Sequence, residues 1–378
     1  MTHIHIETVT DKKQLKRFIK TQYSLYENDP AYIKPLMMER LDALSVDKNP
    51  YFEHAEACFF IAVEDGVDVG TISAQIDQLA QEKWGPNLGH FGLFEAKTPA
   101  VANALFKAAE DWLRQKGMKR MQGPWNLSSN QQCGMLADGF DTPPVIMMPH
   151  GKADYINWTE DNGFKIVKKL LALETDTRNP FDPKTERIAK MARTNKKTNI
   201  RQIDMKNFRA ELDIILDIFN DAWSDNWGFV PMTESEIEHM AKELKPIINP
   251  NTSMIAEYDG KPVAFMIMIP DVNHHIRDLD GKLFPFGVFK LLWRLLINKT
   301  QPRQRVPLMG LRKEMHGNRL TMAMMLEFFI VIQKYINEHG CEFAEMGWIL
   351  EENQSMISMI EAVNGKVYKT YHIYEKDI

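Results

Sequence analysis

A strand, a polar turn with one glycine, a long helix and a second strand follow one another between residues 306 and 348. This order predicts a β-α-β unit, whose two strands are parallel and whose connection is right-handed. The turn, residues 312–319, places backbone N–H groups and the positive end of a helix at the edge of the sheet, where a phosphate binds readily. Arg312 and Arg319 flank the turn. An anion site is one interpretation, and an ordinary turn with solvated charges is the other.

The chain repeats one order of predicted elements. Apolar periodicity and turn residues indicate β, α, α, β, β, β, α, β in the first half, with its second helix over residues 33–43. An irregular polar segment, residues 123–144, then leads to a short helix and a strand that ends near residue 173. From Ile200 the patterns indicate β, α, α, β, β, β, α, β, α, β. Two halves with the same order predict a tandem of one mixed α/β fold.

The polar stretch between the halves divides the chain. We assign residues 1–175 to an N-terminal domain, 176–199 to a connector and 200–378 to a C-terminal domain. The connector is predicted to be partly helical and carries several Lys and Arg side chains. These charges fit a solvated basic face, or a contact with a phosphate-bearing ligand or a lipid surface.

An insertion, residues 270–305, interrupts the second half before the β-α-β unit. Residues 283–299 are apolar with interspersed cations, a composition typical of a helix in a membrane interface. The same composition fits a cover for a long acyl chain, or plain packing between the halves. His274 and His275 are predicted at the end of a strand, where adjacent side chains point to opposite faces and do not form a metal pair.

Composition narrows the possible classes of protein. The net charge of −5 does not favour a nucleic-acid partner. The cysteines, Cys58, Cys133 and Cys341, lack metal-ligand spacing and fit a reducing compartment. No run reaches the ~18 apolar residues of a membrane span, and the first residues lack the features of a signal peptide. We therefore expect a cytoplasmic protein without a metal, with peripheral membrane contact only through residues 283–299.

The repeated order resembles that of the GNAT acyltransferases, the N-acetyltransferase superfamily. In that family a strand leads into a pyrophosphate-binding loop of the form Gln/Arg-x-x-Gly-x-Gly/Ala. Residues 314–320, EMHGNRL, match this loop in part, because Gly317 is present while the leading Gln or Arg and the second small residue are not. Further family-like residues are Asn353, Gly365, Tyr368, Tyr371 and Tyr374.

The whole chain also resembles a family of bacterial tandem GNAT-like proteins of about this length. The shared segments are FGLFE (91–95), GPWNLSSN (123–130), GFDTPP (139–144), NWGF (226–229) and WILEEN (348–353). In the N-terminal half, however, the loop over residues 97–100 has no glycine and contains a proline, which lacks an N–H donor. The resemblance therefore implies a C-terminal domain that holds acyl-CoA and an N-terminal domain that lacks a working pyrophosphate loop and shapes the acceptor site.

The resemblance also implies roles for individual residues. Acyl-CoA or acetyl-CoA would be the donor, with its pantetheine paired along one strand and its pyrophosphate on the following loop. The implied cofactor-binding residues are Met309, Gly310, Leu311, Arg312, His316, Gly317, Asn318, Arg319 and Asn353. The candidate catalytic residues are Tyr371 as an acid and Glu345 or Glu351 as a base. The candidate acceptor-binding residues are Asn130, Trp227, Asn273 and His275.

We therefore predict an N-acyltransferase that moves an acyl group from acyl-CoA to a small-molecule or lipid-like amine. Two alternatives remain. The imperfect loop and the lack of an obvious base favour a non-catalytic protein that binds acyl-CoA. A Fem-type transferase is a tandem of the same fold that uses aminoacyl-tRNA, but the acidic net charge and the loop glycine argue against it.

Overall fold

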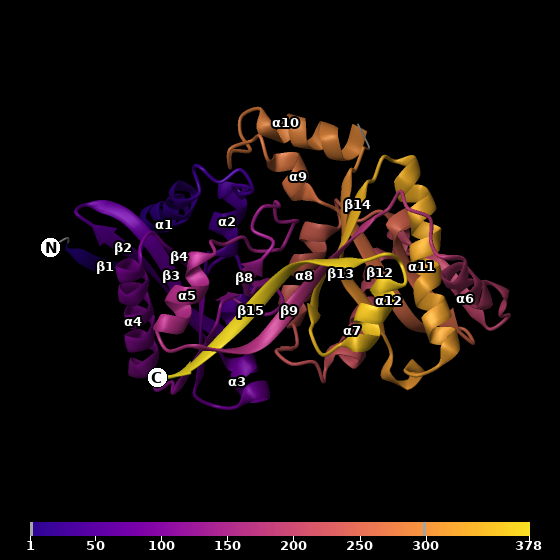
Figure 1. Cartoon of the computed structure of the whole chain (residues 1–378), viewed down its shortest axis with the longest axis horizontal. Coiled ribbons are helices and arrows are strands. Elements are labelled where there is room, and N and C mark those ends of the chain that lie inside the picture. Colours follow the sequence, from indigo (N-terminus) through magenta and orange to yellow (C-terminus); the bar gives the residue numbers. More distant parts are fainter. Residues whose placement is uncertain (1–2, 298–299) are drawn as a thin grey trace.

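One large mixed β-sheet runs through the molecule (Figure 1). The computed structural model describes residues 3–297 and 300–378. Across the sheet the order is β1 (Ile4–Thr8), β2 (Ala55–Glu64), β3 (Val67–Asp77), β4 (Leu88–Ala96), β5 (Arg120–Gly123), β15 (Lys366–Asp377), β9 (Lys165–Asp176), β14 (Phe343–Leu350), β13 (Arg303–Leu311), β12 (Lys261–Pro270), β11 (Ser253–Tyr258) and β10 (Thr198–Gln202). β8 (Met135–Asp138) pairs with β15, and β6 (Trp125–Asn126) pairs with β7 (Gln132–Cys133). The predicted mixed α/β class is confirmed.

The last strands of the two halves meet at the border between them. β15, which ends the second half, pairs with β5 of the first half, so that Tyr374 stands opposite Gly123. β9, which ends the first half, pairs with β14 of the second, so that Leu173 stands opposite Met346. In Figure 1, β15 crosses from the C-terminal half to the N-terminal half. Each half thus adds its last strand to a sheet that both share.

Helices cover both faces of the sheet in each half. In the first half, α4 (Pro99–Gln115) buries Val101, Leu105 and Leu113 against one face, and α1 (Lys12–Leu25) buries Phe18 and Ile19 against the other. In the second half, α11 (Arg319–Glu338) and α7 (Phe208–Trp223) have the corresponding places. The other helices are α2 (Met37–Ala43), α3 (Gln78–Trp84), α5 (Asp154–Asp161), α6 (Pro183–Thr194), α8 (Glu234–Leu244), α9 (Val272–Ile276), α10 (Gly287–Leu292) and α12 (Gln354–Glu361). Short helical turns are η1 (Pro50–Glu53), η2 (Met205–Asn207), η3 (Pro250–Thr252), η4 (Trp293–Ile297) and η5 (Lys313–Met315).

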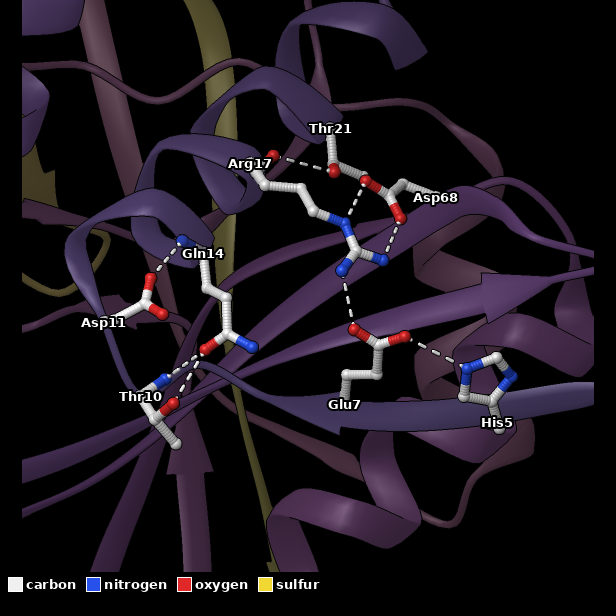
Figure 2. Close-up of polar contacts among 8 residues, drawn as sticks. All are labelled: His5, Glu7, Thr10, Asp11, Gln14, Arg17, Thr21 and Asp68. Atoms are coloured by element: carbon white, nitrogen blue, oxygen red, sulfur yellow. Dashed lines mark hydrogen bonds and ion pairs between the residues drawn. The ribbon is translucent and has the colours of Figure 1, made fainter.

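Polar contacts fix α1 to the strands beneath it (Figure 2). Asp11 caps the helix by accepting a hydrogen bond from Gln14 N at 2.8 Å. The Arg17 guanidinium donates to Glu7 of β1 at 2.6 Å and, through Nε, to Asp68 of β3 at 2.7 Å. One half-buried cation therefore joins the helix to two strands that are far apart in the sequence.

The stretch between the halves is a packed helix over much of its length. α6 buries Ala189 and Ala192 against the core that contains α11. Arg193 donates through Nε to Glu327 of α11 at 2.8 Å, and the Glu327 side chain is nearly fully buried. This cation of the basic stretch therefore forms an ion pair with a carboxylate of the same chain.

Several element boundaries differ from those the sequence predicts. The second helix begins at Met37 rather than residue 33. Helix α3 was not predicted; Asp77 caps it by accepting from Leu79 N at 2.9 Å. His274 and His275 lie in the short helix α9 instead of at a strand end, because Asp271 caps a helical turn there. In the segment 283–299, α10 and η4 form a helix; Asn298 and Lys299 lie outside the described residues.

By length and composition, α11 could cross a membrane, and it is the one helix of the described residues for which this holds. Of its most apolar window, 61% is buried inside the protein. A long apolar helix with this burial is the central helix of a core.

Candidate functional site

The two parallel strands β13 and β14 separate at one edge of the sheet. Their ladder runs from Arg303 opposite Phe343 to Val306 opposite Met346, and both strands then continue past the last pair. The register of β13 against β12 is also irregular near this point. A wedge therefore opens between β13 and β14 toward the loop that follows β13.

Gly317 sets the shape of this loop, which joins β13 to α11. Its φ of +75° lies in the left-handed region, while a Cβ at this position would meet nothing within 4 Å. The requirement for glycine is thus conformational. Asn318 follows and caps α11, accepting from Leu320 N at 2.9 Å.

The loop leaves some donors free and uses others. The backbone N–H of Lys313 donates to Asp221 at 2.9 Å, and that of His316 donates to Lys313 O at 3.0 Å. The N–H groups of residues 317–319 make no hydrogen bond to the described part of the chain. The side chains of His316 and Arg319 are exposed beside them. This end of α11 therefore presents free donors and positive potential.

The other residues predicted to bind the cofactor have structural contacts of their own. Arg312 donates through Nε to Pro262 O at 2.9 Å. Met309 and Leu311 pack in the core of the second half, and a Cβ on Gly310 would lie 2.6 Å from the Phe265 ring. Asn353 lies apart from the loop, where it caps α12 by accepting from Met356 N at 3.2 Å.

A buried polar cluster lies where β13 and β14 separate. Glu345 of β14 faces Arg305 of β13, with Oε2 3.1 Å from Nε, although the angles do not make this contact a hydrogen bond. Arg305 also donates through Nη2 to Gly347 O at 2.8 Å. Burial raises the pKa of Glu345 to about 7, against the opposing effect of Arg305. Of the three predicted catalytic residues, Glu345 lies in this cluster, and Tyr371 is near enough for the charge of Glu345 to act on its pKa.

Tyr371 of β15 is fully buried, and its hydroxyl has no hydrogen-bond partner among the described residues. Burial, and next the charge of Glu345, raise the pKa of this tyrosine far above its ordinary value. Glu351, the third predicted catalytic residue, is exposed in the turn after β14. Glu351 therefore lies outside the buried cluster of Arg305 and Glu345.

A cavity of about 590 Å³ lies between the two halves. Its walls come from α2, the irregular segment after β5, α8, α9 and the α10–η4 helix. They are largely apolar and include the flexible side chains of Met135, Met147, Met148, Met232 and Met240. Methionine side chains adapt to ligands of varied shape, so the cavity suits an apolar chain.

One short segment separates this cavity from the polar cluster. Ile146 and Met148 line the cavity, and Arg305 donates from its other side to Ile146 O and to Met148 Sδ. Ile146 N also donates to Asp271 at 2.8 Å. The cavity therefore adjoins the wedge between β13 and β14.

The residues predicted to bind the acceptor are not all in the cavity. Asn130 and Asn273 line it, and each donates to a backbone oxygen, of Val230 and of Pro144 respectively. Trp227 stacks on Trp125 with ring centroids 5.9 Å apart. His275 is buried and contacts Gln301 at 2.7 Å. Neither of these two rings is among the residues that line the cavity.

The sequence patterns missed two groups in the cavity wall. Glu95, at the end of β4, accepts hydrogen bonds from Tyr26 and Tyr155. His150 contacts Asp29 through Nε2 at 2.8 Å. A signal for Glu95 was available, because it is the one carboxylate in the apolar run of residues 88–96.

In the first half, the corresponding strands also separate, but the chain itself fills the opening. β4 and β5 pair only from Leu88 to His90 of β4. Beyond this point Leu93 N donates to the Asn126 side chain at 2.8 Å. A Cβ on Gly92 would lie 1.8 Å from Trp125 O, so the segment after β5 is in close contact with β4.

No group of three or more His, Cys, Asp or Glu side chains within residues 3–297 and 300–378 is arranged to hold a metal ion. A scan against protein-family models matches none of them to this chain.

The fold is that of tandem GNAT proteins. The chain is similar to a tandem GNAT protein from the clavulanic acid biosynthesis pathway, with a TM-score of 0.59 and 9% identity over 99% of this chain and 98% of that one. It is also similar to a GCN5-related N-acetyltransferase from Sphaerobacter thermophilus, with a TM-score of 0.55 and 11% identity over 99% of this chain and 95% of that one. The predicted tandem GNAT fold is thereby confirmed.

Sequence comparison places the chain more narrowly. A protein of Caulobacter vibrioides named bacterial ceramide synthase is 42% identical over 367 residues, which cover 96% of this chain and 94% of that protein. Protein YghO of Escherichia coli K12 is 41% identical over 377 residues, which cover 99% of this chain and 95% of that protein. The chain belongs to the family of these two bacterial proteins.

Proposed function

We propose that this protein is an N-acyltransferase that moves an acyl group from acyl-CoA to a long-chain, lipid-like amine. The observation that carries this proposal is the large, methionine-rich cavity beside the strand wedge of a GNAT fold. Its volume of about 590 Å³ lies within the ~300–1,000 Å³ of typical ligand pockets. The name of the Caulobacter relative supports the same class of acceptor, since a ceramide is a fatty amide of a long-chain amino alcohol.

For the donor, we propose that the pyrophosphate of CoA binds the free N–H groups of residues 317–319. His316 and Arg319 are exposed beside these donors and would add positive charge. The pantetheine would enter the wedge between β13 and β14, with its thioester near the Arg305–Glu345 pair. There Tyr371 would give a proton to the leaving thiolate, while Glu345 would hold Arg305 in place or accept a proton.

For the acceptor, the cavity would hold the apolar chain. The α10–η4 helix forms part of its wall through Leu291 and Leu295. Large apolar side chains of the same segment face the solvent, among them Phe286 at 79% exposure and Phe289 at 69%. The nearby cations Lys290 and Arg294 pair with Asp278, so a membrane contact would rest on the apolar side chains. We propose that this face lies on a membrane surface, from which a lipid-like amine reaches the cavity.

Thermal unfolding with CoA ligands tests the donor assignment. We expect free CoA to raise the midpoint and palmitoyl-CoA to raise it further, because the acyl chain adds apolar burial. A ligand at ~100 times its dissociation constant stabilises the folded state by about 2.7 kcal/mol. Octyl glucoside at the same concentration controls for a detergent effect. If neither free CoA nor any acyl-CoA changes the midpoint, the donor assignment is wrong.

A further inference from the structure

Glu95 occupies an unusual place in the cavity wall. It is the penultimate residue of the apolar strand β4, and its Oε2 accepts hydrogen bonds from Tyr26 Oη at 2.6 Å and Tyr155 Oη at 2.8 Å. Its other oxygen, Oε1, accepts no hydrogen bond from the described residues, and it is not one of the fully buried side-chain atoms that lack a partner. The carboxylate is thus held by one oxygen and open to the cavity through the other.

The charges around Glu95 come from three neighbouring segments. Tyr26 follows α1, Tyr155 belongs to α5, and Lys152 precedes α5 with its Nζ 5.2 Å from the Tyr26 ring centroid. Burial raises the pKa of Glu95 to about 7, although the two hydroxyls and Lys152 act in the opposite direction. The Glu95 charge in turn raises the pKa values of Tyr26, Tyr32 and Tyr155, after the larger effect of burial.

A second polar pair stands beside this group. The His150 ring is 5.5 Å from the Tyr26 ring, and its Nε2 contacts Asp29 at 2.8 Å. His150 Nδ1 is buried without a partner among the described residues. Burial lowers the pKa of His150, which favours its neutral form, so this pair does not supply a cation for Glu95.

A carboxylate that is largely withdrawn from water favours a cation at its open oxygen, because a charge there is costly without a direct partner, and Lys152 acts on Glu95 without a hydrogen bond to it. The cavity sets the rest of the ligand, since its walls expose more apolar than polar surface, although Glu39, Arg40, Glu236, His239 and Glu243 also line it. A primary ammonium group on a long hydrocarbon chain satisfies both requirements.

We propose that Glu95 binds the amine of the acceptor and takes up its proton, a role that rests on the function proposed above. The ammonium gives one proton to Glu95, and the free amine nitrogen attacks the thioester carbonyl of acyl-CoA. The C–N bond forms, the C–S bond breaks, the thiolate of CoA takes the proton of Tyr371, and Tyr371 recovers the second proton of the nitrogen. The products are an amide and CoA, with protonated Glu95 returning its proton to water.

This role distinguishes Glu95 from the other carboxyl group with a similar pKa, that of Glu345. Both oxygens of Glu345 are sealed from solvent, and Arg305 already stands beside them. Glu95 has an open oxygen and the cavity in front of it; Arg40 lines the same cavity, and Lys152 is the cation that acts on the Glu95 pKa. Of the two, Glu95 is the one that an entering amine can reach.

The test compares Glu95→Gln with Glu110→Gln. Glutamine keeps the acceptor oxygen for both tyrosine hydroxyls, so the first variant is expected to fold. Glu110 is also buried, but it pairs with Lys376 and Arg114 outside the cavity, which makes it a matched control. We expect Glu95→Gln to lower kcat/KM by roughly 100-fold or more, as for loss of a general base, and Glu110→Gln to leave it nearly unchanged.

A pH profile separates this role from a structural one. Activity of the wild type should fall below about pH 7, where Glu95 becomes protonated. Tyr155→Phe removes a hydroxyl that stabilises the carboxylate, so its acidic limb should move to higher pH. If Glu95→Gln keeps wild-type activity and the same acidic limb, Glu95 does not receive the proton.

A binding experiment is independent of catalysis. Octylamine should bind the wild type at pH 8 at least roughly tenfold more tightly than octanol, a difference of about 1.4 kcal/mol, and Glu95→Gln should abolish this preference. Equal preferences in the two proteins would overturn the inference even if acyl transfer occurs. If the wild type transfers no acyl group but shows the Glu95-dependent preference, the proposed function fails while the amine site stands.

Discussion

Arg305 and Glu345 face each other across β13 and β14, one register pair before these strands separate. The sequence distance between them is spanned by the loop and helix α11 of the β-α-β unit. Residues from the segment after β5 contact Arg305 and separate the pair from the cavity, whose wall they also form. One contact thus joins the proposed donor wedge of the second half to the proposed acceptor cavity between the halves.

The Glu345 carboxyl should make stability depend on pH. Its pKa in the folded protein is about 7, above its ordinary value of 4.5, so the folded state holds a proton that the unfolded state has released. Stability from this group is therefore lost as the pH rises from about 4.5 to about 7. Between pH 5 and pH 8, the free energy of unfolding of Glu345→Gln should improve relative to wild type by roughly 2–3 kcal/mol. Urea unfolding at the two pH values measures this change, and Glu351→Gln, at an exposed turn, is the control. An unchanged difference would show that Glu345 titrates as an exposed carboxyl does.

Gly317 should be required for CoA binding beyond its effect on folding. Gly317→Val and Gly260→Val both place a side chain at positive φ, and in neither case does a Cβ meet another atom within 4 Å. Both variants should lose stability by about 1–2 kcal/mol. Only Gly317→Val should weaken the binding of free CoA, by roughly tenfold or about 1.4 kcal/mol, because its loop offers the free N–H groups. Calorimetry with CoA measures both. Equal affinities of the two variants for CoA would show that the loop is not part of the donor site.

CoA should bind with a stoichiometry of one per chain. In the first half, the Asn126 side chain accepts a hydrogen bond from Leu93 N at 2.8 Å, and the Thr98 side chain accepts one from Val101 N, at the start of α4, at 3.3 Å. These side chains take donors that a second CoA would need. Titration calorimetry gives the stoichiometry directly. Two equivalent sites would contradict the proposal that the N-terminal half has no working loop.

The exposed face of the α10–η4 helix should hold the protein on lipid vesicles. The double variant Phe286→Glu, Phe289→Glu should reduce co-sedimentation with phosphatidylcholine–phosphatidylglycerol vesicles by roughly tenfold or more, because the two solvent-exposed aromatic side chains that would enter the lipid are lost. Val67→Glu is the control, since Val67 is 59% exposed at the start of β3. Both proteins should unfold at the wild-type temperature. A wild-type protein that stays in the supernatant would refute the membrane contact.

The sequence was sufficient for the fold because local patterns agree with the structure. The β-α-β unit predicted between residues 306 and 348 is present as β13, α11 and β14, with its two strands parallel. The short helix α3 was missed because its seven residues are fewer than periodicity can resolve. The helix at His274 and His275 depends on a single cap, Asp271, which a strand-end pattern also tolerates.

Local sequence patterns could not predict the border that the two halves share or the cavity between them. β9 and β15 have similar strand compositions, so nothing local shows that each pairs with the opposite half. The cavity combines residues from six or more segments of both halves, which only the tertiary structure brings together. Trp227 was expected in the acceptor site; it stacks on Trp125 and does not line the cavity, so its role there stays a prediction.

Product formation tests the central proposal most directly. Purified protein is incubated with palmitoyl-CoA and sphinganine, and mass spectrometry follows the amide while a thiol reagent follows free CoA. We expect one amide for each CoA released, with wild-type protein and with Glu110→Gln, and strongly reduced amounts with Gly317→Val. Tight binding of palmitoyl-CoA without any amide, from sphinganine or from other long-chain amines, would contradict the proposed acyl transfer. The protein would then be one that binds acyl-CoA without catalysis.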